Sequence, residues 1–232
     1  MSDVEKRATE CRERIDRLQA RLQTRLDARD ISLRAQLPFY ALYYRKTLTW
    51  RMVELSRDAL ECLLKDNPAS GVVLTRAAME TCAGLWTLRK KIEATLGLGK
   101  VGEIGEYLKK LRVGRGKDIV EGDEPKAIHV MDFIRAVEKD CTGFLHQYDL
   151  LSEYAHPNWS GTMMLYSNFD HDNALVDFGR NIRGGDSTKG IGVTNLSVAL
   201  MFFEHSHSKA GDLMPEFTRL CERELDSRAA KT

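Results

Sequence analysis

Residues 69–96 constrain the fold most strongly, because this segment is apolar on nearly every side of a helix. A helix without a polar face does not lie at a surface, so it belongs in the middle of a bundle. Its apolar residues are Val72, Val73, Leu74, Ala77, Ala78, Met79, Cys82, Leu85, Trp86 and Leu88. The segment therefore predicts an all-α protein built as an up-and-down helical bundle.

Arg76 and Glu80 are charged residues within this apolar stretch. A charge buried in a bundle is costly unless it is paired. One interpretation is that the two residues pair with each other, since they lie four residues apart on one helix. The other is that they contact polar residues on a later helix.

Helical patterns elsewhere in the chain supply partners for the central helix, giving five to seven main helices. They cover 37–66, 103–112, 126–140, 144–156, 193–208 and a last helix from 212. After Trp159 the apolar period falls to two, which predicts a small β-hairpin near 162–178, inside an insertion of about 160–190. We expect a bundle domain at 37–229 and an N-terminal arm at 1–36.

The arm begins with a capping box, Ser2 to Glu5, and continues as a heptad repeat. Its two core positions hold Val4, Cys11 and Leu18 and also Ala8, Ile15 and Leu22. Strict seven-residue spacing indicates a helix that packs on one partner helix. That partner is either another helix of the same chain or the arm of a second copy, so a homodimer is among the expected assemblies.

The composition excludes several classes of protein. The net charge is +1, so bulk charge implies neither a nucleic acid nor a membrane partner. The five scattered cysteines form no C-x-x-C pair, which is typical of a reducing compartment. No apolar run is long enough to span a bilayer, and the first 29 residues are highly charged. We expect a cytoplasmic protein without a membrane partner.

A cofactor is not expected. The motif G-x-G-x-x-G occurs at 97–102, but a long predicted helix precedes it, whereas a dinucleotide site needs a strand there. The sequence contains neither a Walker A motif nor a G-x-S-x-G motif.

Residues 144–159 form the most informative polar stretch. They predict a helix that ends at His156, before Pro157, with Tyr148, Ser152 and His156 on one face. A helix C-terminus stabilises a protonated histidine, and a serine four residues earlier lies within hydrogen-bond reach. Such a pair suits acid–base or nucleophilic chemistry. The alternative is a polar clamp that fixes the bundle.

The facing partners of this stripe are expected to be Arg76 and Glu80. The candidate catalytic residues are therefore His156, Ser152, Tyr148, Arg76 and Glu80.

Residues 89–117 are rich in glycine, and lysine and arginine outnumber acidic residues nine to three. Contacts to a phosphate backbone need charge more than fixed geometry. The candidate nucleic-acid-binding residues are Lys100, Lys109, Lys110, Arg112, Arg115 and Lys117. The alternative is an ordinary solvated face.

Two E-x-x-H pairs, at Glu153–His156 and Glu204–His207, suggest an alternative class. In ferritin-like bundles such pairs join carboxylates of two other helices to hold two metal ions. Glu80, with Glu54 or Glu61, could supply them. Two features oppose this alternative, because Pro157 ends its helix and the order of the motifs differs from the ferritin order. We therefore expect no metal site.

The stripe and the central helix together resemble bacterial proteins related to the HEPN superfamily, over roughly 39–159. The residues of the resemblance are Arg76, Glu80, Tyr148, Leu151, Ser152, His156 and Pro157. HEPN domains are helical bundles that commonly dimerise, and they occur in toxin–antitoxin and abortive-infection systems. Active members are metal-independent ribonucleases that use an arginine followed, after four to six residues, by a histidine.

This sequence has no arginine at that distance before His156. The resemblance implies a HEPN-like module of a bacterial defence or stress system, acting by self-association and by binding RNA or a partner protein. RNA cleavage by His156 would be an additional activity. A purely structural dimer is the remaining alternative.

Overall fold

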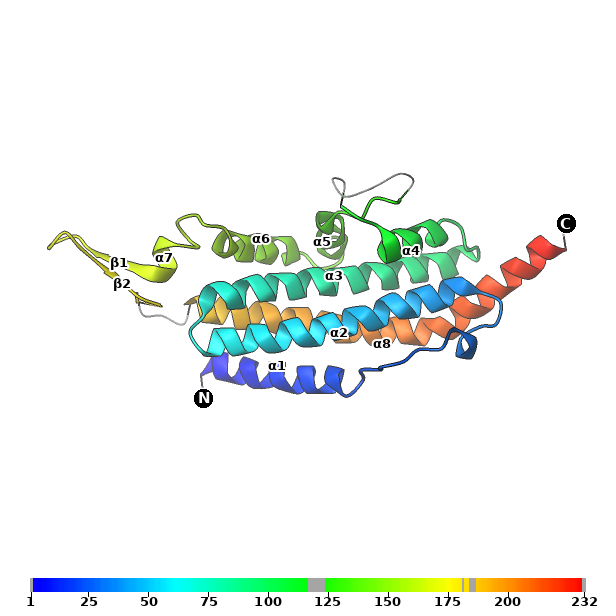
Figure 1. Ribbon diagram of the computed structural model, residues 1–232, viewed down its shortest axis with the longest axis horizontal. Helices are drawn as coiled ribbons and strands as arrows, with labels where there is room; N and C mark the ends of the chain where they lie inside the picture. The colour runs from blue at the N-terminus through cyan, green and yellow to red at the C-terminus, as the bar shows by residue number, and fades with distance from the viewer. Residues whose placement is uncertain (1, 117–123, 181, 184–186, 231–232) are drawn as a thin grey trace.

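The computed structural model describes residues 2–116, 124–180, 182–183 and 187–230. In this part the chain forms eight α-helices, one 3-10 turn and a two-stranded hairpin, which confirms the predicted all-α bundle (Figure 1). The elements are α1 (Asp3–Gln19), η1 (Ala28–Asp30), α2 (Gln36–Leu64), α3 (Pro68–Leu98), α4 (Ile104–Val113), α5 (Val130–Glu138), α6 (Phe144–Ala155), α7 (Met163–Tyr166), β1 (Ser167–Asp170), β2 (Leu175–Phe178) and α8 (Ser187–Ala229). No helix in these ranges combines the length and hydrophobicity of a membrane span.

Helix α3 lies in the middle of the molecule, as its sequence predicts. It packs against α2 and α8 on one side and against α5 and α6 on the other (Figure 1). Its buried residues point in every direction around the helix; they include Val72, Met79, Cys82, Leu85 and Ile92. Any polar residue on its first turns must therefore find a partner on a neighbouring helix.

Helix α1 is a member of the same bundle. It buries Ala8, Cys11, Ile15 and Leu18, four of the six predicted core positions, against α8 and α2 of its own chain. The predicted capping box is present, and Leu22 follows the end of the helix. The heptad therefore describes a contact within the chain.

Two predicted boundaries are wrong. The helices expected at 193–208 and from 212 form one helix, α8, which continues through Pro215. The reason is its apolar face, because Phe203, His207, Ala210, Met214 and Phe217 are buried at alternating steps of four and three. This unbroken stripe outweighs the capping tendency of an aspartate at 212 and the local effect of a proline.

The first strand of the predicted hairpin is also shorter than expected. Residues 163–166 form α7 because no strand lies opposite them in the described chain, and the amides of Leu165 and Tyr166 bond to the carbonyl of Thr162. The strands β1 and β2 pair antiparallel, with Ser167 opposite Phe178 and Asp170 opposite Leu175. The hairpin extends from one end of the bundle (Figure 1).

Three helices approach closely at Leu63. A Cβ atom placed on Gly71 of α3 would lie 2.6 Å from Leu63 Cδ2, and one on Gly192 of α8 would lie 2.5 Å from it. Real Cβ atoms do not approach so closely, so a side chain at either position would force the Leu63 side chain to move. Leu63 is almost completely buried as a result.

Candidate functional site

The structure brings together four of the five predicted catalytic residues. Arg76 donates from Nε to Ser152 Oγ at 3.0 Å and from Nη2 to the Tyr148 hydroxyl at 2.5 Å. The Tyr148 hydroxyl donates to Glu80 Oε1 at 2.9 Å. Arg76 and Glu80 also form an ion pair at 3.5 Å. We call these four residues the α3–α6 cluster.

Helical spacing explains why the cluster forms. Arg76 and Glu80 lie one turn apart on α3, and Tyr148 and Ser152 lie one turn apart on α6, which packs against α3. The two polar side chains on α3 therefore lie at the same levels along the helix axes as the two polar side chains on α6. Both interpretations of Arg76 and Glu80 hold, because they contact each other and the later helix.

The environment of the cluster keeps Tyr148 protonated. The residue is 2% exposed, and burial and the hydrogen bond to Glu80 raise the pKa of its hydroxyl to about 12. The guanidinium of Arg76 lies over the ring, 4.7 Å from its centroid, and opposes this shift only in part. At neutral pH Tyr148 is therefore a hydrogen-bond donor and not a base.

Ser152 has no activating base in the cluster. Its hydroxyl donates to the backbone carbonyl of Tyr148 at 2.9 Å and accepts from Arg76. A serine nucleophile needs an adjacent group that accepts its proton in the reaction, and a peptide carbonyl cannot do this. The cluster is thus a closed network of cation, phenol, hydroxyl and carboxylate, suited to holding α6 against α3.

His156, the fifth residue, does not join the cluster. It is exposed and caps the C-terminus of α6, with its backbone amide donating to the carbonyl of Ser152 at 3.1 Å. Within the described residues its imidazole makes no hydrogen bond to Ser152, so the predicted Ser–His pair is not formed. The side chain of His156 is exposed to solvent at the end of α6.

The two E-x-x-H pairs have separate roles, so the di-metal alternative is wrong for the described chain. Glu204 on α8 accepts hydrogen bonds from Arg14 at 2.5 Å and from Arg17 at 3.0 Å, and so joins α1 to α8. Glu153 is exposed and accepts from Asn158. No group of three or more histidine, cysteine, aspartate or glutamate side chains suited to a metal ion occurs in the residues described.

His207 belongs to a buried contact that the sequence did not predict. Arg45 on α2 donates to the carbonyl of His207 from Nε at 3.0 Å and from Nη2 at 2.8 Å, and Nη2 lies 3.1 Å from His207 Nδ1. Burial, together with the positive charges of Arg45, Lys46 and Arg21, lowers the pKa of His207 to about 3. The imidazole is therefore neutral at pH 7 and accepts a hydrogen bond through Nδ1.

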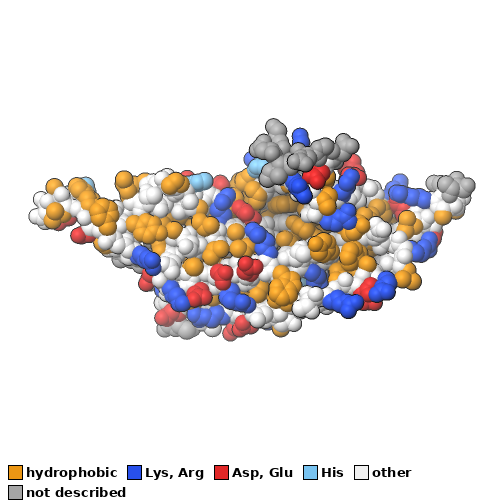
Figure 2. All heavy atoms as spheres, viewed as in Figure 1, with side chains coloured by type: hydrophobic (Ala, Val, Ile, Leu, Met, Phe, Trp, Pro, Cys, Tyr) orange, Lys and Arg blue, Asp and Glu red, His pale blue; other side chains and the backbone are white. Residues whose placement is uncertain are grey.

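The predicted lysines of the basic segment lie around α4 and are exposed. Lys109 and Lys110 are on α4, and Lys100 precedes it. Within the described residues none of these three forms a salt bridge. Lys117 lies outside the described residues. Figure 2 shows Lys and Arg side chains over this part of the molecule.

The two arginines among the predicted nucleic-acid-binding residues have partners. The guanidinium carbon of Arg112 lies 3.9 Å from the centroid of the Tyr40 ring, and Arg115 forms an exposed ion pair with Glu124 at 3.6 Å. Guanidinium groups stacked on aromatic rings keep their edges free for further hydrogen bonds. The α4 patch, defined as Lys100, Lys109, Lys110, Arg112 and Arg115, is thus an accessible cationic surface.

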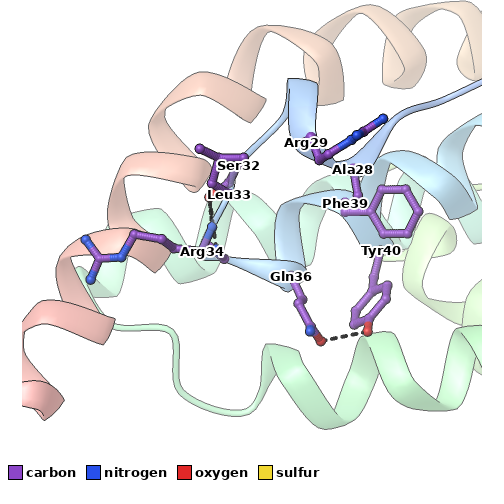
Figure 3. A pocket seen from close by; sticks show the side chains of 9 residues that line it. Ala28, Arg29, Ser32, Leu33, Arg34, Gln36, Phe39 and Tyr40 are labelled. Carbon is purple, nitrogen blue, oxygen red and sulfur yellow. Dashed lines mark hydrogen bonds between the residues drawn. The ribbon is translucent and has the colours of Figure 1, made fainter.

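A hollow of about 340 Å³ lies at the start of α2, near this patch, and was not predicted. Figure 3 shows Phe39 and Arg29 on one side and the hydrogen-bonded pair Gln36 and Tyr40 on the other. Arg34 points toward α8, where it pairs with Asp226. The hollow depends on the path of 28–36, for which the sequence has no periodic pattern.

Comparison with protein-family models gives no match for the chain, and neither the curated proteins nor the solved structures give one. The geometry of the chain itself therefore carries the functional interpretation.

Proposed function

We propose that this chain is a HEPN-like helical module of a bacterial defence or stress system, of the toxin–antitoxin or abortive-infection type, which binds RNA in the cytoplasm. The observation that carries the proposal is the α3–α6 cluster. Arg76, Glu80, Tyr148 and Ser152 are the residues on which the resemblance rests, and they contact one another across two helices of an all-α bundle.

The α4 patch is the RNA-binding surface in this proposal. Lysines without salt-bridge partners exchange counterions for phosphates at little cost, and Arg112 beside Tyr40 offers both charge and an aromatic ring. Contacts of this kind are made with the backbone and are largely independent of sequence. We expect weak, salt-sensitive binding of single-stranded RNA.

Binding is favoured over cleavage by the state of Arg76. The ribonucleases of the HEPN superfamily use an arginine followed, after four to six residues, by a histidine, whereas here the Arg76 guanidinium is bonded to Tyr148 and Ser152. His156 is exposed and lacks a neighbouring cation from its own helix. The cluster serves to position α6.

The binding test uses a fluorescein-labelled single-stranded RNA and fluorescence anisotropy over a range of salt concentrations. Replacing both Lys109→Gln and Lys110→Gln is expected to weaken binding about 10-fold at low salt and to reduce the slope of log K against log salt by about 1.4, since each lost phosphate contact in a single strand contributes about 0.7. The control changes Lys6→Gln and Lys209→Gln, two exposed lysines on α1 and α8. Equal losses in both double variants, or no binding by the wild type, would contradict the proposal.

The cleavage test incubates total RNA with the wild type and with His156→Ala. Intact RNA in both samples agrees with a binding module. Fragments produced by the wild type and absent with His156→Ala would make His156 an acid–base catalyst and overturn the preference for binding alone. The exposed position of His156 means that the substitution leaves the fold unchanged.

A further inference from the structure

The hollow at the start of α2 lies directly beside the α4 patch. Its volume is about 340 Å³, and its lining includes Phe39, Tyr40 and Gln36 (Figure 3). Tyr40 belongs to both places, because the guanidinium of Arg112 lies over its ring. Small-molecule sites have volumes of about 300–1,000 Å³. The hollow is at the lower end of this range, so it suits a single small group.

Phe39 provides an aromatic ring that the bundle core does not use. Its side chain is half-buried, but within the described chain it does not pack on the buried core. Its ring contacts are with Tyr40, at 5.8 Å between centroids, and with Tyr43, at 6.2 Å. Figure 3 shows the rings of Phe39 and Tyr40 next to each other at the hollow. An aromatic ring outside the core is a platform on which another flat group can stack.

Gln36 provides an oriented hydrogen-bond donor at the same hollow. Its Oε1 accepts from the Tyr40 hydroxyl at 2.8 Å, which fixes the orientation of the amide (Figure 3). Among the described residues its Nε2 makes no hydrogen bond, so it can donate to a ligand. Unstacked RNA bases are bound by stacking on aromatic rings and by hydrogen bonds to their edges. Phe39 and Gln36 together offer both kinds of contact.

The charges around the hollow favour a ligand that carries phosphate. Three acidic side chains contact residues of the lining and are engaged there. The pairs are Asp27 with Arg29, Asp226 with Arg34 and Glu222 with Ser32. Both arginines are exposed, and surface ion pairs are weak, so either guanidinium can turn to a phosphate. Arg112 forms no salt bridge with any residue that the structure describes.

A second hollow, of about 320 Å³, adjoins the first and extends it toward the loop before α4. The two share four lining residues: Arg34, Ala35, Gln36 and Tyr40. The far side of the second hollow includes Val101, which directly follows Lys100 of the α4 patch. The hollows and the patch are therefore continuous. A strand whose phosphates lie on the patch can place a base in the hollow, because only a sugar separates a base from its phosphate.

We propose that the hollow at the start of α2 binds one nucleobase of the single-stranded RNA held by the α4 patch, with the base stacked on Phe39 and hydrogen-bonded to Gln36. The inference rests on the proposed RNA binding and adds a base contact to the phosphate contacts. Stacking is possible for every base, so no strong sequence preference is expected. An apolar side chain of a protein partner fits less well, because it would cover the Gln36 amide without accepting its hydrogen bond.

The first test compares the wild type and Phe39→Leu by fluorescence anisotropy, with a uridine oligonucleotide of about 12 nucleotides. The variant keeps an apolar side chain but loses the ring, so affinity should fall about 10-fold. The slope of log K against log salt should not change, because no phosphate contact is lost. Phe169→Leu is the matched control, at an exposed phenylalanine of the hairpin at the other end of the molecule, and should bind like the wild type (Figure 1). Circular dichroism checks that all three proteins are equally helical.

An abasic strand of the same length separates a base contact from an altered patch. It offers only sugars and phosphates, so Phe39→Leu and the wild type should bind it equally. Gln36→Ala should follow the same pattern, with a loss of about 5-fold for the uridine strand and none for the abasic strand. If Phe39→Leu weakened the binding of both strands equally, Phe39 would act only by shaping the α4 patch, and the proposal would be overturned.

Photocrosslinking locates the base without any change to the protein. One uridine of the strand is replaced by 5-iodouridine, which crosslinks on irradiation to an aromatic ring that it contacts. Mass spectrometry of the digested complex should find the adduct on Phe39 or Tyr40. Adducts found only on other residues, or no adduct, would count against the hollow as the base site. Uridine monophosphate at up to about 1 mM should not displace the strand. Displacement would make the hollow a site for a free nucleotide instead.

The two proposals can be separated by the same measurements. A wild type that binds no RNA would overturn both the proposed function and the base site. RNA binding of equal affinity by the wild type and Phe39→Leu would overturn the base site alone, and would leave the hollow to an apolar side chain of a partner protein.

Discussion

The α3–α6 cluster near the start of α3 and the lysines of the α4 patch beyond its end are in opposite states. Near its start, Arg76 and Glu80 are partly buried, with side chains 31% and 25% exposed, and every contact of the α3–α6 cluster is made within the protein. Beyond its other end, separated by ~30 Å of helix, the lysines of the α4 patch face solvent. Paired charges contribute to the fold, whereas unpaired exposed charges are free for a ligand. Substitutions at each site can test this contrast.

The largest effect is expected for Arg76→Met. The change leaves the Glu80 carboxylate and the Tyr148 and Ser152 hydroxyls without their cation, and should lower the free energy of unfolding by about 3 kcal/mol, at the low end for a broken buried pair because the site is partly exposed. Tm should fall by roughly 8 °C for a protein of this size. Calorimetry measures both. RNA affinity of the folded protein should not change.

Arg112→Met is the control at the other end. The change removes an exposed guanidinium from the Tyr40 ring and should lower the free energy of unfolding by about 1 kcal/mol or less. It should also weaken RNA binding. If Arg76→Met instead lowered RNA affinity and left stability unchanged, the roles of the two sites would be reversed.

The next effect concerns pH. The pKa of His207 is lowered to about 3 in the fold from its ordinary value near 6.5, so the unfolded chain binds the additional proton. The contribution of neutral, buried His207 to the free energy of unfolding is complete above about pH 6.5. It is lost as the pH falls toward 3, by up to about 1.4 kcal/mol per pH unit. From pH 6.5 to pH 5 this amounts to about 2 kcal/mol.

Urea unfolding at several pH values measures this loss, and His207→Gln should remove that part of the slope. The side chain and carbonyl of His207 contact Arg45 on α2, and Arg45 is not a residue of the α4 patch. RNA affinity at a pH where the protein is still folded should therefore be constant. A parallel loss of affinity and stability would show that the patch depends on the buried histidine.

The smallest effect is expected for Tyr148→Phe. The ring packing and the contact with the Arg76 guanidinium remain, and the loss is limited to the hydroxyl that bonds Arg76 and Glu80. We expect the free energy of unfolding, measured in urea, to fall by about 1 kcal/mol. Tyr43→Phe, at an exposed tyrosine of α2, should have no measurable effect. If Tyr148→Phe lowered the free energy of unfolding more than Arg76→Met does, the Tyr148 hydroxyl would be the centre of the network.

Features with a helical period could be predicted from the sequence. The central position of α3, the core positions of α1 and the contact between Arg76 and Ser152 all follow from residues three or four apart on one helix face. The exposure of His156 did not follow, because the sequence predicts both the end of the helix and the face of His156 but cannot show which way the side chain of a C-cap residue turns.

Contacts between distant segments could not be predicted where neither residue belongs to a polar stripe recognised in the sequence. Arg45 and His207 are 162 residues apart, and no local pattern links them. The continuity of α8 was missed because aspartate and proline are local signals for the end of a helix. The helix continues because its apolar stripe packs against α3 and α2, and this packing stabilises it on both sides of Pro215. Tertiary packing decided both cases.

The close approach at Leu63 also determines the lengthwise alignment of the helices. A shift of α8 by one residue would bring Ile191 or Val193 against Leu63, which would have to move to make room for the larger side chain. The same shift would move Glu204 along α1, away from Arg14 and Arg17. The space at Gly192 and the ion pairs of Glu204 therefore both favour the observed alignment of this 43-residue helix.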